Sequence, residues 1–169
     1  LLAFLRRAWW PHDAVLGRQD GLKGYHDLAY YPEARRVPGL VMYRFDAPLS
    51  FFNADSFREH VVEVVEAADP PASWVVVAAE PITDIDTSAA EQLLLLLEQL
   101  GDRDVTLAFA ELKDPVRARL RQYELVERIG EERFFPTLGA AVHAYVREQG
   151  IDWVDWEDEP GRPDRTGSA

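Results

Sequence analysis

The sequence predicts an α/β domain built on a mostly parallel sheet. A continuous apolar run at residues 74–79 and a largely apolar run at residues 105–110 are typical of strands that are buried on both faces. Each run is followed by a segment whose apolar residues recur at helical spacing. Hydrophobic residues make up 47% of the 169 residues, which is enough for a substantial core. Buried strands that alternate with amphipathic helices form βαβ units with right-handed crossovers.

Eight elements follow this pattern from residue 40 onward. The strands are predicted at 40–45, 74–79, 105–110 and 134–135, and the helices at 53–68, 87–100, 114–123 and 137–150. Each helix begins at a residue type that caps helices well, and these residues are Asn53, Ser88, Asp114 (followed by Pro115) and Thr137. Pro70 ends the first helix, Gly101 the second and Gly150 the last, as proline and glycine commonly do.

Charge is distributed unevenly along the chain. Residues 1–44 hold seven Lys/Arg and four Asp/Glu, residues 45–149 hold nine and twenty, and residues 150–169 hold two and six. The net charge of −12 argues against nucleic acid as a partner, because phosphate binding requires clustered positive charge. Cysteine is absent, which excludes disulfides, thiolate catalysis and zinc ribbons.

Residues 1–10 predict the end of a membrane helix and its exit from the bilayer. Arg6 and Arg7 stand beside Trp9 and Trp10, a pattern typical of the cytoplasmic side, where indole rings lie at headgroup level. The alternative is a short amphipathic helix packed on the folded body. The chain begins with Leu1 instead of Met, so we expect it to continue a longer protein. No apolar run reaches the roughly 18 residues that cross a bilayer.

Two further segments flank the folded body, which is expected at residues 40–149. Residues 11–39 are rich in proline and glycine, which predicts an extended connector that lies against the body. Residues 150–169 are acidic and then rich in proline, glycine and serine, which predicts a disordered tail.

Few residues offer catalytic chemistry. The glycine motifs that cradle phosphate are missing, and so is the Gly-x-Ser-x-Gly elbow of serine hydrolases. The four histidines lie too far apart in sequence for a metal motif, and they are His12, His26, His60 and His143. We therefore expect no metal, no cofactor and no enzyme activity, and a small α/β enzyme is the least favoured interpretation.

The segment at residues 82–93 is the strongest candidate for a functional site. It joins a buried strand to a helix, where open α/β sheets place their ligands. Ser88 and Glu91 form the Ser-x-x-Glu pattern of a capping box. A phosphate on Thr87 or Ser88 would be favoured by the helix N-terminus, whereas Asp84 and Asp86 oppose it. We predict that Asp84, Asp86, Thr87 and Ser88 form an interaction or phosphorylation loop, and the alternative is a helix cap alone.

These segments resemble the STAS domain, a family named for sulfate transporters and anti-sigma factor antagonists. The resemblance lies in Asp-Ile-Asp-Thr-Ser-Ala-Ala-Glu-Gln-Leu at 84–93, the strand that follows it, and the Asp-Pro pair at 114–115. The N-terminal part looks like the stretch after the last membrane helix of bacterial SulP-type anion permeases. This second resemblance lies in Pro-His-Asp-Ala-Val-Leu-Gly-Arg at 11–18 and Pro-Gly-Leu-Val-Met-Tyr-Arg-Phe-Asp at 38–46.

The resemblance, which covers about residues 1–149, implies a mixed sheet of about four or five strands with helices mainly on one side. It implies a non-catalytic domain at the cytoplasmic face of the bacterial inner membrane, as the C-terminal part of a secondary anion transporter. That domain would support folding, assembly or regulation through protein contacts. The implied partners are the membrane domain of the same transporter, a second copy and a soluble regulatory protein.

The alternative is a free-standing anti-sigma factor antagonist switched by phosphorylation. In that branch of the family the phosphorylated serine lies in an Asp-Ser-Ser-Gly loop, and Ser88 occupies the matching position. The sequence departs from the pattern at Thr87 and Ala89, which replace the first serine and the glycine.

Overall fold

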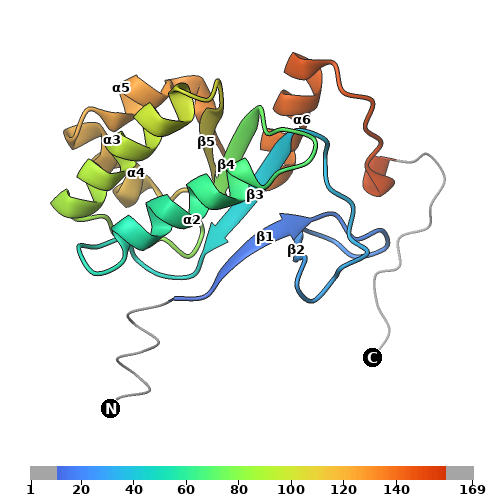
Figure 1. The fold of residues 1–169 in the computed structure, drawn as a ribbon, viewed down its shortest axis with the longest axis horizontal. Helices are drawn as coiled ribbons and strands as arrows, with labels where there is room; N and C mark the ends of the chain where they lie inside the picture. Colours follow the sequence, from blue (N-terminus) through green and yellow to red (C-terminus); the bar gives the residue numbers. More distant parts are fainter. Residues whose placement is uncertain (1–10, 159–169) are drawn as a thin grey trace, which may run out of the picture.

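The computed structural model describes residues 11–158 of the chain (Figure 1). In this part, a sheet of six strands has the order β2-β1-β3-β4-β5-β6. The strands are β1 (Asp13–Gly17), β2 (His26–Asp27), β3 (Leu40–Phe45), β4 (Trp74–Ala78), β5 (Thr106–Ala110) and β6 (Phe134–Phe135). The helices are α2 (Ala54–Glu66), α3 (Thr87–Gly101), α4 (Asp114–Gln122), α5 (Leu125–Ile129) and α6 (Leu138–Gln149), with short 3-10 helices η1 (Glu131–Arg133) and η2 (Trp156–Asp158).

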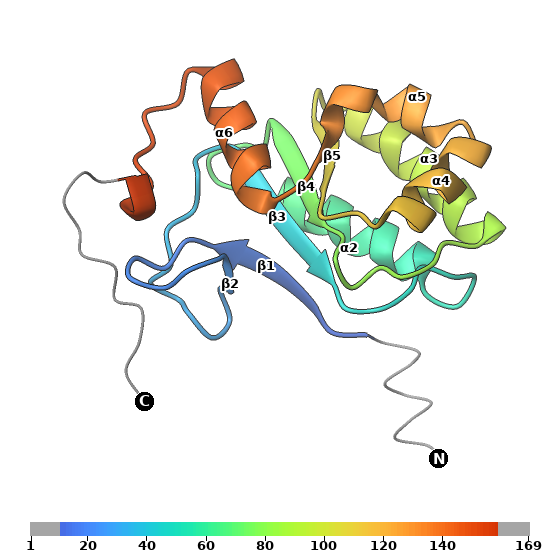
Figure 2. The same cartoon turned by 180° about the vertical axis from the view of Figure 1, so that it is seen from behind.

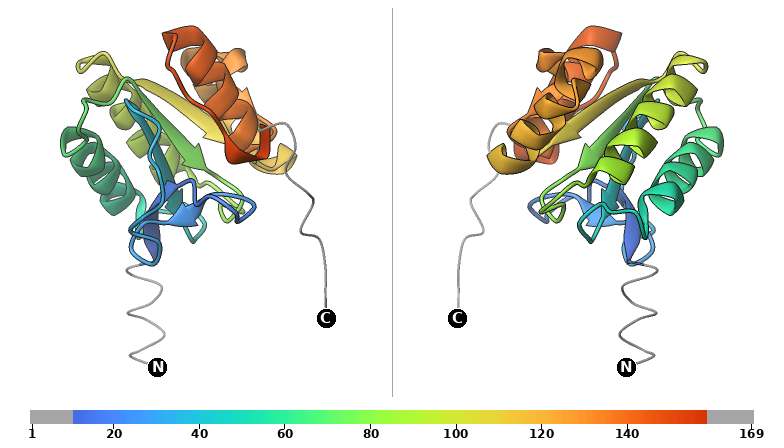
Figure 3. Two further views of the ribbon diagram at one scale, coloured as in Figure 1. Left: turned by 90° about the vertical axis from the view of Figure 1, so that its right-hand side faces the viewer. Right: turned by 90° about the vertical axis from the view of Figure 1, so that its left-hand side faces the viewer.

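The sheet is mixed, and most helices cover one of its faces. β1 runs antiparallel to β2 and β3, whereas the pairs from β3 to β6 are parallel. α2 and α3 lie in front of the sheet in Figure 1, together with α4 and α5, and α6 packs on the opposite face (Figure 2). In side view the sheet separates α2 from α6 (Figure 3). The predicted class is therefore confirmed, and the strand count slightly exceeds the expected four or five.

The apolar run in β4 explains this layering. Val75 and Val77 belong to the core under α2 and α3, whereas Trp74, Val76 and Ala78 belong to the core under α6. All five side chains are buried, because helices cover both faces of this central strand. β5 also presents alanines to α6, and such small side chains let a helix lie close to a sheet.

The elements predicted from residue 40 onward are present, with ends that differ by a few residues. Thr137 caps α6 as predicted, since its Oγ1 accepts a hydrogen bond from the Ala140 N–H at 3.0 Å. Gly150 ends that helix in the left-handed conformation that glycine adopts most easily. β1, β2 and α5 were not predicted, and β1 and β2 lie within the supposed extended connector.

One predicted helix cap is confirmed in position only, and one is wrong. Asn53 occupies the N-cap position of α2 as predicted, but its side chain accepts the Ser50 N–H at 3.0 Å and stabilises the preceding turn instead of the helix. Lys113 occupies the N-cap position of α4, and Asp114 is already the first helical residue. The carboxylate of Asp114 still lies in the first turn, where negative charge favours a helix.

Candidate functional site

The loops that follow β3 and β4 lie together at one edge of the sheet. β3 and β4 are parallel neighbours, so their carboxyl ends point the same way. A bridge between Leu49 and Ile85 joins the loops, with the Leu49 N–H donating to Asp84 O at 3.0 Å and the Asp86 N–H donating to Leu49 O at 3.3 Å. Asp13, the first residue of β1, pairs with the last residue of β3. The connector therefore enters the domain beside the predicted interaction loop.

Asp86 connects these two loops through a single carboxylate. Its Oδ1 accepts the Ala89 N–H at 2.8 Å and so caps α3. Its Oδ2 accepts the Phe51 N–H at 2.8 Å. One side chain thus stabilises both the helix and the approach of the β3–α2 loop.

The predicted capping box of Ser88 and Glu91 is therefore wrong. α3 begins at Thr87, so Ser88 already lies within the first turn. Aspartate and serine cap helices about equally well. Asp86 is the residue that caps α3, because its carboxylate also accepts a second hydrogen bond, from the Phe51 N–H of the neighbouring loop.

The other residues of the predicted interaction loop have different surroundings. Thr87 Oγ1 lies 3.2 Å from the hydroxyl of Tyr123, which ends α4. Asp84 accepts the hydrogen bond of the next backbone N–H at 2.9 Å and lies 3.6 Å from Arg119. Ser88 is exposed. The loop is therefore held through Asp84, Asp86 and Thr87, and the Ser88 side chain faces solvent.

Asp86→Ala is expected to lower the free energy of unfolding by about 1–3 kcal/mol, because it removes the cap of α3 and leaves the Phe51 N–H without its acceptor. Ser88→Ala should change that free energy by less than about 0.5 kcal/mol, since it alters an exposed position inside the helix. Urea unfolding of the two variants measures the difference. Equal losses for both would contradict the assignment of the cap.

A second cluster, absent from the predictions, binds the tail to the connector. Arg18 is only 3% exposed, and its guanidinium donates to Asp155 Oδ1 at 2.8 and 3.0 Å and to Gly24 O at 2.7 Å. The same guanidinium lies 4.9 Å from the ring centre of Tyr25 and 5.6 Å from that of Trp156. We call Arg18, Tyr25, Asp155 and Trp156 the Arg18 clasp.

The predicted disorder of the tail is consequently wrong for residues 151–158. Arg35 of the connector lies 4.5 Å from the ring centre of Trp153 and donates to Val154 O at 3.1 Å. Asp155 is 6% exposed. Two tryptophans in the acidic tail were the signal in the sequence that this part is ordered. Such large rings are usually buried against other parts of a protein.

A cavity of about 480 Å³ lies beside the Arg18 clasp, next to the first residues of α6. Its lining includes Glu80, Glu111, Glu157 and Asp158. These carboxylates disfavour an anionic ligand, although the N-terminus of α6 favours one. Within residues 11–158, no group of three or more His, Asp or Glu side chains is arranged to hold a metal ion.

Stability is expected to decrease as the pH rises above about 10, the ordinary pKa of tyrosine. Burial raises the pKa of Tyr25 to about 12, and burial together with a hydrogen bond to Asp13 raises the pKa of Tyr43 well above its usual range. The unfolded chain therefore loses these protons at lower pH than the folded domain, and deprotonation favours unfolding. Thermal unfolding at a series of alkaline pH values measures the decrease. Tyr43→Phe should weaken the pH dependence, and an unchanged slope would contradict this interpretation.

The four residues of the predicted membrane exit, Arg6, Arg7, Trp9 and Trp10, lie outside the described residues, so that prediction remains a prediction. From residue 11 to residue 158, the structure contains no helix with the length and apolar character of a membrane span.

Residues 31–141 match the STAS domain family, and this match covers more than half of the chain. The chain belongs to the STAS domain family. A probable sulfate transporter of Mycobacterium tuberculosis is 43% identical over 147 residues, which are 87% of this chain and 26% of that transporter. This STAS domain therefore spans about a quarter of the length of that relative.

Solved structures of two other proteins share the fold. The murine Slc26a9 anion transporter in its inward-facing state matches with a TM-score of 0.74 and 16% identity, over 87% of this chain and 24% of that one. The SulP transporter STAS domain of Vibrio cholerae matches with a TM-score of 0.60 and 17% identity, over 73% of this chain and 93% of that one. At these identities the structures establish the fold, and the mycobacterial relative provides the closer link to sulfate transporters.

Proposed function

We propose that this chain is the cytoplasmic STAS domain of a SulP-type secondary anion transporter, joined to the C-terminal end of its membrane domain. The observation that carries this proposal is the 43% identity to a protein named as a probable sulfate transporter, over 87% of the chain. Arg6, Arg7, Trp9 and Trp10 support the placement, because paired arginines and tryptophans are typical of a cytoplasmic membrane exit.

The domain acts through protein contacts and not through catalysis. The polar groups of the candidate loop already serve the fold, since Asp86 caps α3 and Asp84 bonds to backbone. The partners we propose are the membrane domain of the same transporter, a second copy of the domain and a soluble regulatory protein. Through these contacts the domain supports folding, assembly or regulation of transport.

Uptake of radiolabelled sulfate by the full-length transporter, with and without residues 11–158, tests this function. We expect the truncated transporter either to be absent from the membrane or to be present with reduced uptake, and immunoblotting of membrane fractions separates these two results. Wild-type uptake at a wild-type membrane level would overturn the proposal.

A phosphorylation-switched anti-sigma factor antagonist is the second candidate function. The observation in its favour is the exposed Ser88 in the first turn of α3, where the helix dipole stabilises a phosphate. Mass spectrometry of the protein from cells tests it. Phosphate on Ser88 or Thr87, together with binding to a soluble kinase, would favour this function over the transporter domain.

A further inference from the structure

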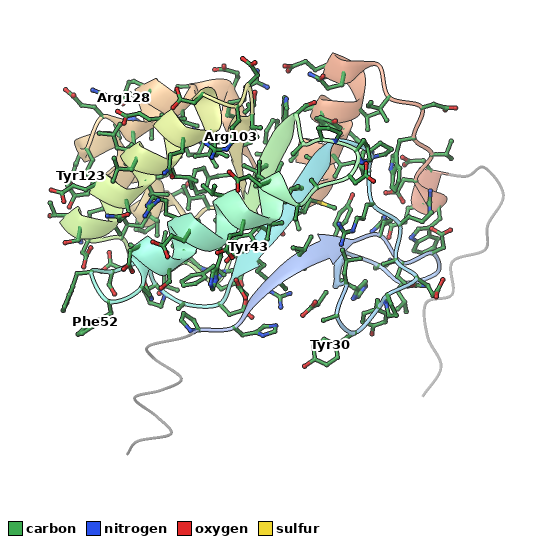
Figure 4. All side chains as sticks on the ribbon, in the orientation of Figure 1. Tyr30, Tyr43, Phe52, Arg103, Tyr123 and Arg128 are labelled. Carbon is green, nitrogen blue, oxygen red and sulfur yellow. The ribbon has the colours of Figure 1, made fainter. Side chains whose placement is uncertain are left out.

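Two adjacent phenylalanines on the β3–α2 loop are exposed at the sheet edge described above. Phe51 is 64% exposed and Phe52 is 50% exposed, and their ring centres lie 3.8 Å apart. Phe52 projects outward beyond the start of α2 (Figure 4). Single exposed apolar side chains are common on soluble domains, but a patch of adjacent large ones is typical of an interaction surface. We call Phe51 and Phe52 the aromatic pair.

The backbone that carries the aromatic pair is held in one shape. The Phe51 N–H donates to Asp86 Oδ2 at 2.8 Å. Asn53, which is 4% exposed, accepts the Ser50 N–H and donates to Pro48 O, each at 3.0 Å. A loop fixed in this way loses little conformational freedom when it binds, so the two rings are preorganised for a partner.

Carboxylates lie near the aromatic pair in the chain and on the adjoining loop. Asp46 and Asp55 lie on either side of it in the chain, and Asp84 and Asp86 belong to the adjoining loop. Arginines pair with Asp46 and approach Asp84, so the four carboxylates are only partly compensated. These carboxylates repel an anionic lipid surface. They attract the cytoplasmic loops of membrane proteins, because such loops carry an excess of lysine and arginine.

The connector begins at the same edge. The Asp46 N–H donates to His12 O at 2.9 Å, so His12 lies directly beside the loop that carries the aromatic pair. If the connector follows a membrane helix, as proposed above, this edge is the part of the domain nearest to the membrane domain.

We propose that Phe51 and Phe52 dock into an apolar pocket, bordered by lysine or arginine side chains, on the cytoplasmic side of the transporter's own membrane domain. This inference rests on the proposed function. The rings supply apolar contact area at the centre of the interface, and the carboxylates around them select a basic border.

Photo-cross-linking in the full-length transporter tests the surface directly. p-Benzoylphenylalanine replaces Phe51 or Phe52 in separate variants, and Val154 in a matched control. Val154 is 56% exposed and lies beside the Arg18 clasp, near the end of β1 and so at the opposite edge of the sheet. After irradiation of native membranes, mass spectrometry identifies what is attached to each position.

We expect peptides of the membrane domain to be attached at positions 51 and 52, and little or no such product at position 154, because only the first two positions lie in the proposed contact. Products with lipid, or with the STAS domain of a second copy, would overturn the inference, and so would equal yields at the three positions. The sulfate uptake experiment above does not depend on the cross-linking result. The cross-linking can therefore contradict the docking of Phe51 and Phe52 without contradicting the proposed function.

Discussion

Arg18→Ala is expected to lower the free energy of unfolding by about 3–5 kcal/mol, because removal of one partner leaves a buried charge uncompensated. Arg18 and Asp155 are both almost fully buried, so loss of the guanidinium leaves the Asp155 carboxylate without a charged partner in a poorly hydrated place. Urea unfolding measures the loss. A red shift in tryptophan fluorescence should accompany the opening of the Arg18 clasp, since the Arg18 guanidinium lies over the Trp156 ring.

Two control variants distinguish the effect of the buried ion pair between Arg18 and Asp155 from that of a more exposed ion pair. Arg35→Ala should cost less than Arg18→Ala, because the side chains of Arg35 and its partner Asp20 are 39% and 49% exposed, even though Arg35 also contacts Trp153 and Val154. Arg18→Met combined with Asp155→Leu should recover much of the loss, since apolar side chains of similar volume replace a buried ion pair well. Equal losses for Arg18→Ala and Arg35→Ala would refute the role of the Arg18 clasp.

Gly39→Ala is expected to destabilise the domain by about 2–4 kcal/mol, through backbone strain and the loss of a buried hydrogen bond. Gly39 has a φ of +76°, a conformation that residues with a Cβ adopt at a cost. A Cβ at this position would overlap the hydroxyl of Tyr145, which donates to Pro38 O at 2.8 Å. Tyr145 is 1% exposed and its ring packs against Trp74, so it cannot move without disturbing the core under α6.

Thermal unfolding of three variants tests this account of Gly39. Gly101→Ala is the matched control, because nothing lies within 4 Å of its Cβ position at the end of α3, and it should be neutral or slightly stabilising. Tyr145→Phe removes the hydroxyl, so the combination of Gly39→Ala with Tyr145→Phe should cost less than the sum of the two single changes. A strictly additive result would show that the overlap contributes nothing.

The part of the fold set by local pattern could be predicted from the sequence. The run at residues 74–79 identified β4 because a strand covered on both faces needs no polar positions. The apolar residues at 87–100 identified α3 because they recur at helical spacing and so form one apolar face. The cap of α3 was misassigned because Asp86 and Ser88 have similar capping preferences, and the choice depends on the Phe51 N–H of another loop.

The remaining features depend on contacts between distant parts of the chain. β1 has only five residues, ends in glycine, and is defined by its pairing with β3. Arg18 and Asp155 are separated by 137 positions, and no local pattern links them. The candidate loop at 84–88 was found because its position after a buried strand is a local property. The aromatic pair was not predicted, since exposure is visible only in the folded chain.

Both outer strands of the sheet are very short, with two residues each in β2 and β6. A strand of this length offers few unpaired backbone groups to another chain. A second copy of the domain therefore finds little template for continuing the sheet from one molecule into the next. Self-association of the domain is therefore expected to use helix or loop surfaces, and the short outer strands disfavour edge-to-edge aggregation in a concentrated solution.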